Sequence, residues 1–196
     1  DVGGSEGSEA VVAGIVALHC RVDRDVPGGI VAGCVSFSSA LRQLSYTQLS
    51  DSATQLVHVD ALLAQHSFRE VIVSTTLADE VPTVAAALDR IAQRVGGVRI
   101  VAVPAADFSA AAIPETIRVL GEYLRVPGHA FALSELPDAA AALVALVRHA
   151  GFVGDAAFRG AFSLKRISTN SILRLDTAAI AALNVVSPTG EGAKGD

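Results

Sequence analysis

Length, composition and charge limit the kinds of protein that this sequence can encode. The chain has 196 residues, of which 51% are hydrophobic and 18% are charged, and its formal net charge is -5. This length suits one domain, or a domain with a fragment, and allows a sizeable core. The negative charge argues against an electrostatic clamp on DNA, because phosphate binding relies on clustered Lys and Arg. The longest apolar runs, at 10–18 and 139–147, are too short to cross a bilayer.

The N-terminal quarter of the chain predicts a linker followed by three strands. Residues 1–9 are small, polar and rich in glycine, so we expect a flexible linker there. The sequence begins with Asp and has no signal-like segment, which we interpret as a piece of a longer protein. Short turns separate the apolar runs that follow, at 11–22, 30–37 and 44–49. We predict an antiparallel meander whose outer strand is the open edge, in a chain that is monomeric.

The middle of the chain alternates helical and strand-like segments. Helical spacing of apolar residues at 56–63 precedes a short apolar strand at 70–73. Pro82 then opens a helix that Gly96 closes, and a second strand follows at 99–103. Two more helices are expected around 113–124 and 136–147, the latter stopped by Gly151. We therefore predict an α/β fold with an RNase H-like mixed sheet, in which three antiparallel strands precede two parallel strands, with flanking helices.

Cysteine and histidine usage indicates neither a disulfide framework nor a metal site. Cys20 and Cys34 fall on neighbouring predicted strands and could lie opposite each other, but without a secretory signal we expect reduced core residues. The five histidines lack the short paired spacing of zinc ligands, so we predict no structural metal.

Signatures of catalysis are missing where this fold would carry them. RNase H-like nucleases hold metal ions with carboxylates, usually beginning in the first strand, yet residues 10–22 contain no Asp or Glu. Glu70 and Asp107 lie at strand ends, where caps are commoner, and no phosphate-binding loop occurs. We expect no enzyme activity. The alternative is a small α/β enzyme or nucleotide-binding domain of unrelated ancestry, with its site at the C-terminal ends of strands, at 74–76 and 104–107.

A resemblance to a known family begins with residues 173–184, which read Leu-Arg-Leu-Asp-Thr-Ala-Ala-Ile-Ala-Ala-Leu-Asn. An extended segment leads into a helix that Asp176 can cap and that ends near Asn184. This stretch resembles the junction between the connector domain and the lever helices of MutS-type mismatch repair proteins. Residues 29–49, and Ala-Asp-Phe-Ser at 106–109, resemble connector segments of the same family. The branch most resembled is the second eukaryotic MutS homologue, the subunit shared by both mismatch-recognition heterodimers.

The resemblance implies a role and a division of the chain. Residues 10–155 would be an RNase H-like connector, and 156–196 would be an extended crossing segment and the truncated start of the lever, with Arg174, Asp176 and Asn184 at the joint. A connector relays nucleotide and DNA state between domains and offers a surface to MutL-type heterodimers. This segment itself would hold no cofactor. The parent would be a nuclear ATPase that uses ATP and Mg²⁺, pairs with another MutS homologue and binds mismatched DNA.

Overall fold

A mixed six-stranded sheet forms the centre of the computed structural model, which describes residues 14–65 and 68–168. The strand order is β5-β4-β1-β2-β3-β6. β1 pairs with β2, and β2 with β3, in antiparallel fashion, whereas β1–β4, β4–β5 and β3–β6 are parallel pairs. The predicted α/β class and the predicted meander followed by two parallel strands are therefore confirmed. The strands are β1 (Gly14–Val22), β2 (Gly29–Ser38), β3 (Gln43–Ser52), β4 (Phe68–Ser74), β5 (Arg99–Val103) and β6 (Ser163–Arg166).

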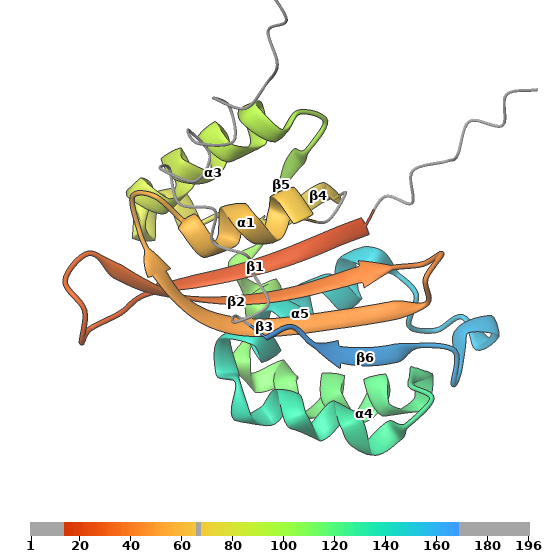
Figure 1. The fold of residues 1–196 in the computed structure, drawn as a ribbon. Coiled ribbons are helices and arrows are strands. Elements are labelled where there is room, and N and C mark those ends of the chain that lie inside the picture. Colours follow the sequence, from red (N-terminus) through yellow and green to blue (C-terminus); the bar gives the residue numbers. More distant parts are fainter. Residues whose placement is uncertain (1–13, 66–67, 169–196) are drawn as a thin grey trace, which may run out of the picture.

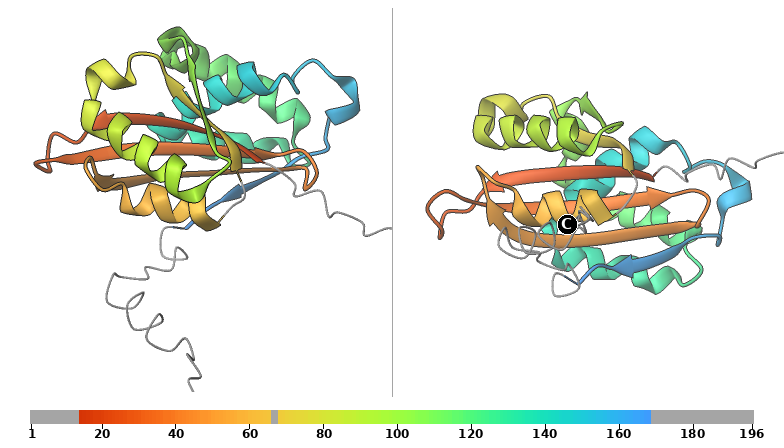
Figure 2. Two further views of the ribbon diagram at one scale, coloured as in Figure 1. Left: turned by 90° about the horizontal axis from the view of Figure 1, so that it is seen from above. Right: turned by 45° about the horizontal axis from the view of Figure 1, so that its top comes forward.

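Helices cover both faces of this sheet (Figures 1 and 2). The α-helices are α1 (Val57–Gln65), α2 (Leu77–Glu80), α3 (Pro82–Val95), α4 (Ile113–Tyr123) and α5 (Pro137–Ala150). Four 3-10 segments join them within the part of the chain that the structure describes: η1 (Ala105–Phe108), η2 (Ala110–Ala112), η3 (Pro127–Glu135) and η4 (Ala156–Phe158). α1 and α3 pack on one face, and α4 and α5 on the other, so the sheet separates two hydrophobic cores.

The alternation of side chains along β1 supplies both cores from one strand. Val16, Leu18 and Cys20 belong to the core beneath α1 and α3, whereas Ala17 belongs to the core beneath α5. This is the period of two expected of a strand. β1 is therefore covered on both faces, which accounts for its nearly continuous apolar sequence.

Proline and glycine fix the ends of the two longest helices. Pro82 and Pro137 lie in the first turns of α3 and α5. Backbone N–H groups there have no acceptor within the helix, so proline, which lacks an N–H, costs no hydrogen bond. Gly96 and Gly151 follow the last turns with φ values of 71° and 63°, a conformation that costs glycine little. The helix ends predicted at Pro82, Gly96 and Gly151 are confirmed. None of the helices in the described ranges is long and apolar enough to span a membrane.

Helix α1 is capped by a side chain from the preceding strand. Oδ2 of Asp51 accepts hydrogen bonds from the amides of His58 (2.8 Å) and Val59 (3.0 Å). Asp51 itself belongs to β3, where it pairs with Ile30. Leu56, at φ 50°, lies in the turn between this strand and the helix. The capping role is thus filled by Asp51 across the turn rather than by the residue next to the helix.

The segment after α5 contributes a strand to the sheet. Residues 156–172 are predicted as an extended crossing to the lever, but Ser163–Arg166 form β6 and pair with Gln43–Tyr46. The preceding Phe162 is fully buried against Phe37 and Phe152, which holds this segment on the core. The prediction that β3 is the open edge is therefore wrong for its first half. In the described sheet the outermost strands are β5 and β6.

Both cysteines are reduced core residues, as predicted. In the register of β1 and β2, Cys20 lies opposite Ala32 and Cys34 opposite Leu18, so the two thiols are diagonal neighbours rather than a facing pair. Burial raises the pKa of Cys34 to about 12. Burial, followed by the nearby Cys34, raises the pKa of Cys20 well above its ordinary value. Neither thiol is activated in the folded chain.

Candidate functional site

The start of α5 lies directly on the sheet at Gly33. A Cβ atom at this position would be 2.0 Å from the backbone carbonyl carbon of Asp138 and 2.2 Å from the amide nitrogen of Ala139. Only a residue without a side chain permits this approach. The first turn of α5 therefore crosses β2 in close contact, and groups from neighbouring strands can reach it.

The polar groups around this crossing come from three adjacent strands. The register places His19 of β1 and Gln48 of β3 on either side of Gly33. Oε1 of Gln48 accepts hydrogen bonds from the amides of Asp138 (2.9 Å) and Ala139 (3.4 Å). Leu136, at the N-cap position, has no side-chain oxygen to do so. The helix start is capped by the sheet.

The Asp138 carboxylate, whose side chain is 4% exposed, faces two basic side chains of β1. Nε of Arg21 lies 3.0 Å from both carboxylate oxygens and donates to them. Nδ1 of His19 is buried and lies 3.3 Å from Oδ1, outside hydrogen-bonding geometry. Burial raises the pKa of Asp138, but the His19 and Arg21 side chains more than offset it, and the net pKa is lowered.

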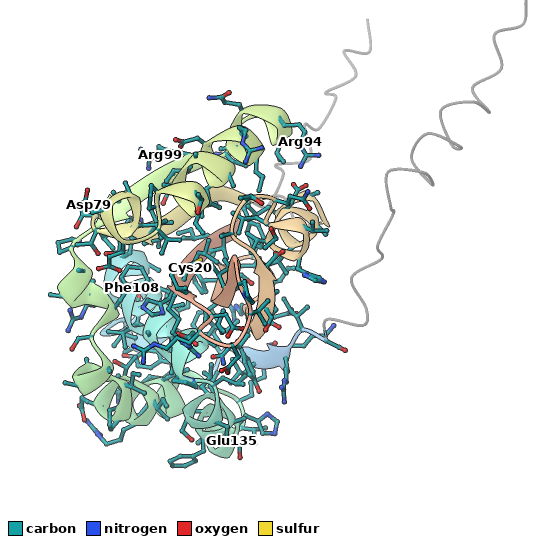
Figure 3. The ribbon with its side chains drawn as sticks, turned by 90° about the vertical axis from the view of Figure 1, so that its left-hand side faces the viewer. Cys20, Asp79, Arg94, Arg99, Phe108 and Glu135 are labelled. Atoms are coloured by element: carbon teal, nitrogen blue, oxygen red, sulfur yellow. The ribbon has the colours of Figure 1, made fainter. Side chains whose placement is uncertain are left out.

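Phe108 closes the inner side of this cluster. Its ring centroid lies 5.6 Å from that of His19, and its side chain is buried. Figure 3 shows Phe108 in the interior together with Cys20, whereas Arg94 and Arg99 lie at the surface. The side chains of His19 and Arg21 are 29% and 51% exposed, so the cluster reaches solvent through its basic members.

This arrangement is suited to holding a helix rather than to chemistry. Both oxygens of the Asp138 carboxylate accept from a guanidinium, and a positive charge beside a carboxylate opposes the binding of a divalent cation. Within residues 14–65 and 68–168, no three His, Cys, Asp or Glu side chains are grouped as a metal ion would require. The His19–Asp138 pair has an imidazole next to a carboxylate, but no described contact joins it to a nucleophile.

The strand ends at 74–76 and 104–107 are engaged in local structure. Oγ of Ser74 and Oγ1 of Thr76 are 2.9 Å apart, and the amide of Thr76 donates to Oγ of Ser74. Asp107 forms an ion pair of 2.8 Å with Arg148 of α5. These groups stabilise the turns after β4 and β5.

Glu70, considered above as a strand-end cap, instead joins three elements. Its Oε2 lies 3.0 Å from Nε2 of His149 at the end of α5, and its Oε1 pairs with Arg99 of β5. The hydrogen bond from His149, followed by that from Arg99, lowers the pKa of the Glu70 carboxyl. α5 is therefore tied to the sheet by polar side-chain contacts near both of its ends.

Sequence reasoning did not predict the group of side chains around the start of α5, which we call the α5 cluster: His19, Arg21, Gln48, Phe108 and Asp138. Arg174, Asp176 and Asn184, the predicted junction residues, lie outside the described residues. Of the residues that form the cluster, Asp138 offered the clearest signal, since it follows Pro137 at the start of a predicted helix. His19 and Arg21 interrupt an apolar strand on one face, which is a second signal that a polar partner lies opposite.

No protein-family model matches this chain, and no curated protein shows significant sequence similarity to it. The sheet order and the contacts at the start of α5 are therefore the structural observations on which a function can be argued.

Proposed function

We propose that this chain is the connector segment of a MutS-type DNA mismatch repair protein and has an RNase H-like fold. The observation that carries the proposal is the strand order β5-β4-β1-β2-β3, with an antiparallel meander and two parallel crossovers. An RNase H-like connector would have this order, and the sequence resemblance leads to the same domain by a separate route. The resembling stretch at 29–49 covers β2 and most of β3, in the middle of this sheet.

A role without enzyme chemistry is supported by the groups on β1. A nuclease of this fold needs carboxylates there to hold metal ions. The polar side chains of β1 on this face are instead those of His19 and Arg21. Both contact Asp138, whose carboxylate accepts hydrogen bonds from Arg21. We infer that the chain acts through its surfaces and its rigidity. It would relay nucleotide and DNA state between its neighbours in the parent protein and offer a face to MutL-type heterodimers.

The partners and location follow from this assignment. The parent would pair with another MutS homologue, bind mismatched DNA, use ATP and Mg²⁺ in a separate domain, and work in the nucleus. The chain alone would be monomeric. Its net charge of -5 suits a module that meets other protein surfaces rather than one that holds the DNA backbone by itself.

The parent reading frame provides the first test. We expect the coding sequence beyond Asp196 to continue into a long helical region and then a phosphate-binding loop of the form Gly-x-x-x-x-Gly-Lys-Ser/Thr. A stop codon shortly after Asp196 would contradict the proposal. Sequencing the transcript settles this without any need for purified protein.

Binding provides a second, independent test. The chain is titrated against a MutL-type heterodimer from the same source by interferometry at low and physiological salt. Saturable binding that persists at physiological salt would support a docking surface, because purely electrostatic encounters weaken as salt screens them. Binding that disappears at physiological salt would count against it.

A further inference from the structure

Two large apolar side chains are exposed at one end of the molecule. Leu41, in the β2–β3 turn, is 68% exposed, and Val126, just after α4, is 50% exposed. Single exposed apolar residues are common on protein surfaces, whereas neighbouring ones on a rigid framework often mark an interaction site.

The start of β6 connects these two positions. The amide of Ser163 donates to the carbonyl of Arg42 (2.9 Å), and the amide of Arg125 donates to the carbonyl of Phe162 (2.8 Å). The consecutive residues Phe162 and Ser163, where β6 begins, thus bind the segment after α4 and the β2–β3 turn. Figure 1 shows the β2–β3 turn and the start of β6 at the same end of the sheet. We call Leu41, Arg42, Arg125, Val126 and Arg159 the β6 end.

The β6 end has an excess of positive charge. Among the described residues, neither Arg42 nor Arg125 has a carboxylate within ion-pair distance, and Nε of Arg125 donates to the carbonyl of Ala161. Arg159 shares the carboxylate of Glu122 with Arg118, each at 3.6 Å. The chain as a whole has a net charge of -5, so this end differs in sign from the average surface.

We propose that the β6 end is the docking surface for an acidic segment with apolar side chains, carried by the MutL-type partner. Charge complementarity selects an acidic segment, and Leu41 and Val126 provide the apolar contacts that resist salt. The choice of partner rests on the proposed function.

Paired variants test the surface. Leu41→Ser with Val126→Ser removes the apolar contacts, while Val57→Ser with Val95→Ser makes the same kind of change at residues 47% and 37% exposed on α1 and α3. We expect the first variant to bind the heterodimer about tenfold more weakly at physiological salt, as loss of central apolar contacts does. The second variant should bind like the unchanged chain. Circular dichroism confirms that both fold.

A photo-reactive side chain at position 126 tests the chemistry of the occupant. Crosslinking to the heterodimer, followed by mass spectrometry, should identify a segment with net negative charge. Capture of a basic segment would overturn the charge argument. Arg42→Gln with Arg125→Gln should slow association and flatten its salt dependence, because charges outside the apolar contacts mainly steer the encounter.

The outcomes separate this proposal from the proposed function. Equal affinity of the unchanged chain and Leu41→Ser/Val126→Ser overturns the docking surface and leaves the connector assignment in place. Absence of binding by every form of the chain also overturns it, and the parent reading frame then decides the connector assignment alone.

Discussion

Gly33 lies where the backbone of α5 packs directly on the sheet, and it gives a sharp test of their packing. Replacement by Ala places a Cβ 2.0 Å from the backbone of Asp138, so α5 must move and its contacts with β1 and β2 loosen. We expect Gly33→Ala to lower the free energy of unfolding by about 3 kcal/mol or more, through overpacking against backbone. Urea denaturation measures this.

Gly128→Ala is the matched control, because a Cβ at position 128 meets nothing within 4 Å. Its stability should stay within about 0.5 kcal/mol of the unchanged chain. If Gly33→Ala changed the free energy of unfolding as little as Gly128→Ala, that result would contradict the close contact between β2 and α5.

Asp138 predicts a pH dependence of stability. Its folded pKa is lowered, so its contribution is complete above the unfolded pKa of about 4 and is lost as the pH falls through the folded pKa. Asp138→Asn should cost about 1 kcal/mol at pH 7, a modest value because water screens the half-exposed Arg21. The difference in stability between the two proteins should narrow once the pH falls below the unfolded pKa and close below the lowered folded pKa.

Denaturation at several pH values measures that gap. Asp79→Asn, at an exposed position on α2, serves as the control and should show no comparable gap. A gap for Asp138→Asn that is constant across pH would mean that the carboxylate charge is not what holds α5 to β1.

The α5 cluster shows why individual site residues were hard to predict. Arg21 and Asp138 are 117 positions apart in the sequence. Local patterns indicate that each residue is unusual for its element, but they do not say which residues meet. Only the register between β1, β2 and β3, together with the crossing of α5, brings His19, Gln48 and Asp138 to one place.

At the scale of elements, local chemistry predicted most of the fold. Proline at the start and glycine at the end determine the limits of α3, and alternating or continuous apolar runs identified β1 to β5. β6 escaped prediction because it has only four residues, Ser163–Arg166, two of which are charged. Its pairing depends on a distant strand, which no local pattern encodes.

Phe162 predicts how much β6 matters. It is fully buried and its ring contacts those of Phe37, Phe152 and Phe158. Phe162→Ala should lower the free energy of unfolding by about 3–5 kcal/mol, through lost burial and the cavity that remains. Phe131→Ala, at a side chain 68% exposed, should change it by less than about 0.5 kcal/mol. Equal effects of the two variants would place 162 outside the core.

At the scale of the whole molecule, the buried thiols report on global opening. Cys20 and Cys34 lie inside the core beneath α1 and α3, and burial raises the pKa of both. We expect Ellman's reagent to modify neither thiol appreciably in the native protein at pH 7.5–8, and both along the urea unfolding curve, because thiolate is the reacting form. Rapid reaction in the absence of urea would show that this core opens locally.

The late position of β6 in the sequence has a consequence for synthesis on the ribosome. Phe37 and β3 are made early, but the aromatic ring and the strand that complete their packing appear only at Phe162 and Ser163–Arg166. Until that stretch has left the exit tunnel, the nascent chain carries an unpaired strand edge and an incomplete aromatic cluster. The growing chain therefore has a long interval in which a chaperone can bind it before β6 completes the sheet.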